Sequence, residues 1–311
     1  MEISFVVLMT LFAAALRIAA PLTLAGLGET ISEKSGILNI GIEGMMLTGA
    51  FFSFITTFYT GSLLLGCIAG IVSGILLSLI HGVLSIECKA NQTIVGLAIN
   101  FLALGLTSFI FLKIFGQSTV LPASKMITVL KIPVLSKIPF VGPIIFSQDS
   151  IVYLMFFLIL LVWVFLYKTQ WGVSLLAVGE YPRAADTVGI SVKKVRYLAV
   201  IANGFFCGLA GSYLILGQLG FFIENLTSGQ GYIALVAVIL GRRNPIGVFL
   251  ATLVFGFASA LQFNLQTLGW NIPSQLFSMF PYVITVIALL FTIGKSSDPA
   301  SLGIPYERDG R

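Results

Sequence analysis

The sequence predicts an all-α membrane protein, a bundle of about 8–10 spanning segments in a single domain over residues 1–311. The chain is 58% hydrophobic and only 9% charged, whereas soluble domains are about 45–50% apolar and about 25% charged. Uncharged stretches reach the length of about 20 residues that a spanning helix needs, and one of them covers residues 62–86. Open sheet edges leave backbone groups unpaired in lipid, so these long apolar runs are expected to be helices.

In chain order, the apolar runs predict helices over 4–27, 39–60, 62–86, 91–115, 150–168, 196–218, 229–241, 245–266 and 275–294. A turn at 28–39 and a polar cytoplasmic loop at 169–195 separate some of them. The run at 229–241 is too short to cross a bilayer alone, which predicts a half-helix that lines an enclosed cavity. Four prolines indicate that the loop at 116–150 is ordered by turns. That loop either docks a soluble partner or packs over the bundle.

Lysine and arginine are unevenly distributed along the chain. If 169–195 is cytoplasmic, 12 of the 17 basic residues lie on that side, in agreement with the positive-inside rule. The N-terminus is then outside and the C-terminus inside. Because the basic residues flank apolar segments, the net charge of +5 indicates membrane lipid and not nucleic acid as the partner.

Two runs of small residues recur every fourth position and predict close helix packing. Residues four apart share a helix face, where small side chains let another backbone approach. The runs are Ser62, Gly66, Gly70, Gly74, Ser78 and Gly82, and then Gly204, Gly208 and Ser212.

The loop at 169–195 carries the caps of a short helix. Pro182 suits the first helical position and Gly189 the left-handed residue after its end. Between them lies a small face of Ala184 and Ala185, and Ser191 can cap the next helix. A short, rigid surface helix is what a mechanical contact with a partner requires.

Three segments and the tail carry a family resemblance. Residues 27–47 read LGETISEKSGILNIGIEGMML, residues 177–190 read AVGEYPRAADTVGI, and residues 229–247 read GQGYIALVAVILGRRNPIG. They resemble segments of the ABC importer permeases of the branched-chain amino acid, simple sugar and nucleoside group, as does the tail at 302–306. The first segment is most similar to the nucleoside-type members. The matches run over almost the whole chain.

The resemblance implies a non-enzymatic permease subunit of an ATP-driven importer in the inner membrane of a bacterium. The implied partners are a second permease in a heterodimer, separate ABC ATPase subunits that hold ATP and Mg²⁺, and an extracytoplasmic substrate-binding protein. No cofactor is expected in this chain. Nucleosides are the favoured substrates, with simple sugars and riboflavin as alternatives. The implied ATPase-coupling residues are Gly179, Glu180, Pro182, Arg183, Ala184, Ala185, Gly189 and Ile190. Leu176 departs from a basic residue that is common in the family.

Polar residues inside the membrane are functional candidates. Asn100 and Asn203 could bind a passing solute or only a neighbouring helix. Arg17 and Glu43 could pair, or Arg17 could reach the interface while Glu43 binds backbone. Backbone N–H groups at 228–231 would present a positive dipole end to the pathway. The full set of pathway candidates is Asn39, Glu43, Asn100, Asn203, Gln218 and Gln230.

Other functional classes find less support in the residues. The chain has no phosphate-binding loop motif and no nucleophile–base set. His81 is the one histidine, without a metal-ligand pattern around it. The leading alternative is an ion-coupled secondary transporter, which needs embedded acids such as Glu43. A membrane-embedded enzyme is the third possibility.

Overall fold

The computed structural model describes residues 2–116, 122–133, 135–139, 141–267, 279–290 and 298–307. The first half contains helices α1 (Glu2–Lys34), α2 (Ile42–Thr60), α3 (Leu63–Gly82, extended by the π-turn η1, Val83–Glu87) and α4 (Gln92–Phe115). The second half contains α6 (Ser150–Lys168), α7 (Gln170–Glu180), α8 (Pro182–Thr187), α9 (Val192–Tyr213, extended by the π-turn η3, Leu214–Leu219), α10 (Gln230–Leu240), α11 (Pro245–Thr267) and α13 (Phe280–Leu290).

The predicted all-α membrane bundle is confirmed. Within the described ranges, six helices are long and apolar enough to cross a bilayer, namely those over Leu8–Lys34, Leu63–Glu87, Gln92–Phe115, Ser150–Lys168, Val192–Leu219 and Pro245–Gln266. Helix α2 has 19 residues with Glu43 in its first turn. Helices α10 and α13 have 11 residues each. The expected half-helix at 229–241 is therefore present as α10.

Two helix boundaries differ from the prediction. Helix α1 runs to Lys34 and not to 27, because Gly28 faces α9 and does not end the helix. A Cβ at Gly28 would lie 2.8 Å from Phe206 Cβ and 3.1 Å from Asn203 Cα, so glycine is there for close packing. The chain turns at Gly36, whose φ is +90°. The region at 169–195 is mostly helical, since α7 and α8 occupy most of it.

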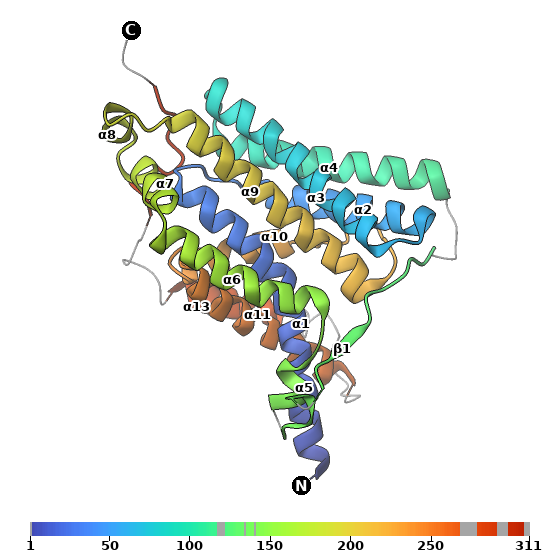
Figure 1. Ribbon diagram of the computed structural model, residues 1–311. Coiled ribbons are helices and arrows are strands. Elements are labelled where there is room, and N and C mark those ends of the chain that lie inside the picture. Colours follow the sequence, from blue (N-terminus) through green and yellow to red (C-terminus); the bar gives the residue numbers. More distant parts are fainter. Residues whose placement is uncertain are drawn as a thin grey trace.

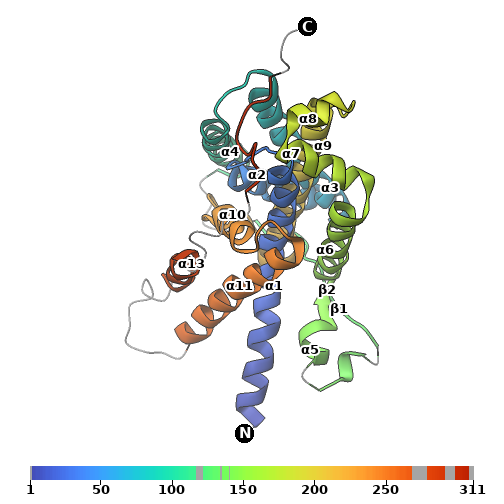
Figure 2. The same ribbon diagram turned by 90° about the vertical axis from the view of Figure 1, so that its left-hand side faces the viewer.

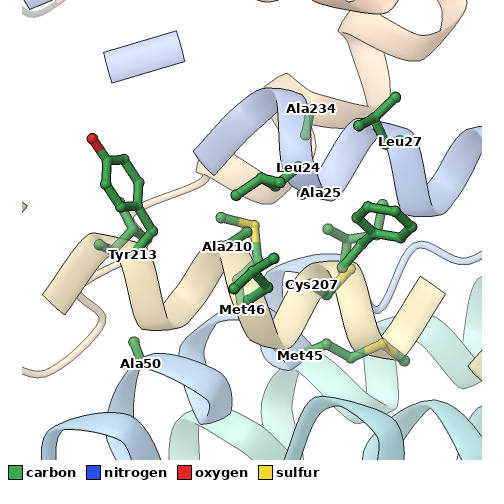
Figure 3. Packing of buried hydrophobic residues seen from close by; sticks show 14 of the residues in the cluster. Leu24, Ala25, Leu27, Met45, Met46, Ala50, Cys207, Ala210, Tyr213 and Ala234 are labelled. Atoms are coloured by element: carbon green, nitrogen blue, oxygen red, sulfur yellow. The ribbon is translucent and has the colours of Figure 1, made fainter. Parts of the chain in front are cut away.

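The core lies where α1, α2, α9 and α10 meet. Figure 3 shows Leu24 and Ala25 of α1, Met46 of α2, Ala210 of α9 and Ala234 of α10 within one cluster. All five are fully buried. Small and long side chains alternate across this junction, which allows four helices to fill one interior at high density.

The close helix packing that the small-residue runs predict is present, and the structure shows that the two runs, on α3 and α9, face each other. A Cβ at Gly74 would lie 2.4 Å from the carbonyl oxygen of Gly204, and one at Gly208 would lie 2.4 Å from that of Gly70. Real Cβ atoms do not approach so closely, so the two backbones leave room only for hydrogen.

The segment between α4 and α6 is ordered by turns and packs on the bundle. It contains strands β1 (Val129–Lys131) and β2 (Ser147–Asp149), paired antiparallel, the 3₁₀ turn η2 (Leu135–Lys137) and the short helix α5 (Val141–Ile145). Backbone bonds tie it to the end of α9, with Ile127 N–H donating to Leu216 O at 2.7 Å. The strand pair was not predicted. Docking of a soluble partner on this segment stays a prediction.

The two ends of the bundle are formed by different elements. Figure 1 shows α7, α8 and the C-terminal segment at one end, and the N-terminus, α5 and β1 at the other. Helices α10, α11 and α13 lie on one side of α1, and α6 lies on the other (Figure 2). The end that carries α8 is the predicted cytoplasmic end.

Candidate functional site

Glu43 caps the half-helix α10. Its two carboxylate oxygens accept hydrogen bonds from the backbone N–H groups of Gly229, at 2.7 Å, and Gly231, at 2.6 Å. Gly229 has a φ of +87°, and a Cβ at Gly231 would lie 2.6 Å from the Glu43 nitrogen. The sequence-based expectation of free N–H groups here is therefore wrong, because a carboxylate from α2 occupies two of them.

Arg17 and Glu43 do not pair. The Arg17 guanidinium instead donates to Gln148 Oε1 at 2.8 Å and to Ser147 O at 3.3 Å, in strand β2. Of the alternative, the structure shows the part in which Glu43 binds backbone. Arg17 instead finds its partner within the protein, since Gln148 is fully buried. Arg17 thus fastens the segment between α4 and α6 to α1.

The two intramembrane asparagines both bond neighbouring helices. Asn100 accepts from Gly44 N–H at 2.8 Å and donates to Ile40 O at 3.0 Å and to the Tyr232 hydroxyl at 2.9 Å. Asn203 is fully buried and donates to the Glu29 carboxylate. Their part in transport stays a prediction.

A pair of buried acidic residues that the sequence analysis missed lies toward the end of the bundle that carries α7 and α8. The carboxylate of Glu29 accepts from Asn203 and, at 2.9 Å, from the backbone of Asn39. One turn later, the carboxylate of Glu33 pairs with Arg243, which also reaches Asp298 Oδ1 at 2.5 Å. Glu33 and Arg243 belong to the 27–47 and 229–247 segments that carry the family resemblance. Nothing in the local sequence of either segment indicates that the two meet. Asn39 lies in this network and not beside the cleft described next.

An open cleft of about 360 Å³ lies between α1, η3, α10, α11 and α13, toward the outer end of α10. Two of the predicted pathway residues, Gln218 and Gln230, line it. The described lining does not include Asn39, Glu43, Asn100 or Asn203. We call this cavity the outer cleft. Its other polar lining residues, which sequence reasoning missed, are Ser228, Ser259, Gln262 and Tyr282.

Helix α8 has the caps that the sequence predicts. Pro182 is its first residue, and Gly189 follows its end with a φ of +90°. Helix α9 begins after Ser191, but the Ser191 side chain makes no capping bond. Tyr181 and Val188, which flank α8, are 71% and 75% exposed, so large side chains project from this end of the bundle.

The predicted shallow alanine face is only half present. Ala184 is exposed, whereas Ala185 is 3% exposed and packs against Val178 and Val192. The reason is the helical period, because Ala185 points about 100° away from Ala184 around the helix axis, toward Val178 and Val192. Ala185 therefore belongs to the seat of α8 and not to its outer surface.

The C-terminal segment forms the other wall of this end. Gly179 O accepts from Ser301 N–H at 3.0 Å, and Glu180 accepts from Ala300 N–H at 3.2 Å. A groove of about 580 Å³ runs between α8 and the tail, with Arg183 and Tyr306 among its lining residues. Gly179 leaves no room for a side chain, since a Cβ would lie 2.1 Å from Lys34 O. Ile190 is half-buried beneath α8.

Comparison with known proteins gives concordant results. Residues 11–289 match the family model described as branched-chain amino acid transport system / permease component. The chain is 41% identical to the guanosine ABC transporter permease protein NupQ of Bacillus subtilis, over 94% of this chain and 95% of that one. It is 35% identical to the nucleoside ABC transporter permease protein NupC of Lactococcus lactis, over 93% of each.

Two more distant likenesses add to these. The guanosine ABC transporter permease protein NupP of Bacillus subtilis is 26% identical over 90% of this chain and 82% of its own length. A solved structure described as a metal-chelate type ABC transporter in an inward-facing conformation has 17% identity and a TM-score of 0.50, over 90% of this chain and 85% of that one. That structure supports the fold alone. By the family match and the full-length relatives, the chain belongs to the branched-chain amino acid transport system permease components.

Proposed function

We propose that this permease is one subunit of an ATP-driven importer for nucleosides in the inner membrane of a bacterium. The observation that carries the proposal is its near full-length similarity to two permease proteins of guanosine and nucleoside ABC transporters. Simple sugars and riboflavin are the alternative substrates. In this proposal the chain forms half of the translocation pathway and performs no catalysis itself.

The subunit acts with a second, different permease. Bacillus subtilis has two guanosine permease proteins that both resemble this chain, one at 41% and one at 26% identity, which is the pattern of a heterodimer. Separate ATPase subunits bind ATP and Mg²⁺, and an extracytoplasmic protein delivers the substrate. The outer cleft opens on one side of this chain, so a second subunit can close the pathway.

Helix α8 is the proposed contact with the ATPase. It is short, begins at Pro182, is followed by the left-handed Gly189, and is seated on Val178 and Val192 by Ala185. A force on α8 therefore passes to α7 and α9, which is the mechanical link that ATP-driven transport needs. Arg183 and Ala184 are exposed for the contact, and Gly189 sets the turn that presents it.

The complete complex in proteoliposomes tests the proposal. ATP hydrolysis should rise when the binding protein and a nucleoside are both present, and labelled nucleoside should accumulate in preference to glucose or riboflavin. Uptake driven by a proton or sodium gradient without ATP would instead identify a secondary transporter.

Two variants separate coupling from folding. Ala184→Trp adds bulk on the exposed face of α8 and should lower nucleoside-stimulated ATP hydrolysis while leaving the permease folded. Ala185→Trp should disrupt the seat of α8 and reduce the yield of folded protein. Normal stimulation in a complex with Ala184→Trp would contradict the assignment of α8.

A further inference from the structure

We infer that the outer cleft is the solute site of this permease, that it takes an uncharged solute with both hydrogen-bond donors and acceptors, and that Glu43 is the positioning residue that keeps it uncharged. The inference rests on the proposed transport function and deepens it by naming the site and the chemistry it selects. A nucleoside fits this class, because its base and ribose are neutral and carry amide, amine and hydroxyl groups.

The polar groups that line the cleft are uncharged, and they offer both hydrogen-bond donors and hydrogen-bond acceptors. Three carboxamides, two serine hydroxyls and one phenol line it, and each can both donate and accept hydrogen bonds. Among the lining residues that the structure describes, none is charged. The polar set is Gln218, Ser228, Gln230, Ser259, Gln262 and Tyr282.

The rest of the lining is apolar and includes two aromatic rings. Phe255 is fully buried, whereas Phe263 is 56% exposed and its ring is accessible from the cleft. A planar base can pack against such a ring with its polar edges left for the carboxamides. The volume of about 360 Å³ falls in the usual range for small-molecule sites.

Glu43 decides the electrostatic character of the cleft. The N-terminus of a helix carries roughly half a positive charge and free N–H groups, and so attracts anions. Here the carboxylate of Glu43 binds Gly229 and Gly231, the two residues on either side of Gln230. The negative charge of Glu43 thus offsets the positive end of the α10 dipole that borders the cleft. Glu43 does so from outside the cleft, because it is not part of the described lining.

The same contacts place the side chain of Gln230. Both neighbouring N–H groups are held by one carboxylate, so the first turn of α10 is fastened to α2. On the rim, Ser228 has a φ of +44°, and its carbonyl accepts from the Tyr282 hydroxyl at 3.3 Å. A left-handed serine is uncommon and costs free energy, and it directs this loop toward the cleft.

A charged solute finds no compensating partner in this lining. Moving an unpaired carboxylate, ammonium or phosphate out of water is costly. The cleft should therefore reject zwitterionic amino acids and nucleotides while it accepts nucleosides. This selection operates in the permease itself, in addition to that of the binding protein.

The test uses the complete transporter in proteoliposomes with labelled nucleoside. Gln230→Leu and Gln262→Leu should each raise the nucleoside concentration for half-maximal uptake by about three- to tenfold, the effect of losing one hydrogen bond. The matched control is Gln266→Leu, which lies one turn after Gln262 on α11 and outside the cleft lining, and it should behave like the wild type.

Glu43→Gln tests the electrostatic part. Its amide keeps one acceptor oxygen for Gly229 or Gly231 but presents an N–H group to the other. The substitution should therefore break half of the cap and remove the negative charge that offsets the positive end of α10. Competition by a nucleoside 5′-monophosphate against nucleoside uptake should then appear, although the wild type is not inhibited. A loss of assembly alone would lower both activities together and leave this selectivity ratio unchanged, which would overturn the role given to Glu43.

Gln230→Cys tests what occupies the cleft. Saturating nucleoside should slow its reaction with a water-soluble thiol reagent in the assembled complex. If the second permease or lipid shields the cysteine fully without nucleoside, the cleft is an interface and the inference fails. Nucleoside uptake by the wild type together with unaffected glutamine variants would also overturn it while leaving the proposed function intact. Absence of any ATP-driven nucleoside uptake by the wild type would instead overturn the proposed function.

Discussion

Replacing Glu33 with leucine should destabilise the folded permease by about 3 kcal/mol, because it leaves the buried charge of Arg243 short of a partner. Both side chains are nearly inaccessible, with 1% of Glu33 and 5% of Arg243 exposed. Breaking a buried ion pair costs about 3–5 kcal/mol. The lower end applies here, since Arg243 keeps Asp298, whose side chain is 51% exposed and remains solvated.

The double variant Glu33→Leu with Arg243→Met gives the sharper expectation. Both buried charges are then removed, and well-packed apolar replacements of a buried pair are often neutral or stabilising. The double variant should therefore be more stable than Glu33→Leu alone by about 1 kcal/mol or more. If the two residues did not interact, the destabilisations caused by the two substitutions would add.

The assay is unfolding by SDS in mixed micelles, followed by far-ultraviolet circular dichroism. Glu307→Gln is the control, because Glu307 pairs with Lys89 at 2.6 Å on an exposed surface and its loss should have no measurable effect. Equal or greater destabilisation of the double variant, compared with the sum of the single variants, would refute the reasoning.

Three further predictions follow from the fold. Gly208→Val should abolish monodisperse protein in gel filtration, because its Cβ would lie 2.4 Å from Gly70 O, whereas Gly105→Val, with open space around it, should not. Gly189→Val should strain the turn after α8 by about 1–2 kcal/mol and weaken ATPase binding in a pull-down. The strain comes from the backbone alone, because nothing lies within 4 Å of an added Cβ. Full binding would show that this turn does not present the contact. Single cysteines at Lys131 and Arg183 should react from opposite sides of the membrane, and labelling of both from one side would disprove the orientation.

Much of the fold could be predicted because lipid restricts the choices. Backbone groups must be satisfied within each segment, so length and hydropathy alone indicate helices. The small-residue periodicity of α3 and α9 predicted close packing of each helix, since residues four apart lie on one helix face. That the two helices pack against each other came from the structure. The caps of α8 were equally readable, because Pro182 and Gly189 act through their own backbone.

The candidate site was only partly predictable, because its residues meet across long sequence separations. Gln218 and Gln230 were identified, but Gln262 and Tyr282 join them through the packing of α11 and α13, which no local pattern records. Ala185 was expected to be exposed on the basis of residue size. Its burial depends on Val178 and Val192, on two other helices.

What the sequence by itself determined is the class of protein, most of its helices and the family, since these depend on composition, local spacing and matched motifs. What only the tertiary structure decided is which polar groups find each other. Glu43 was a candidate for an ion pair with Arg17, yet it binds backbone 186 and 188 residues away. In an apolar interior each polar group must find a partner, and which partner it finds depends on how the helices cross.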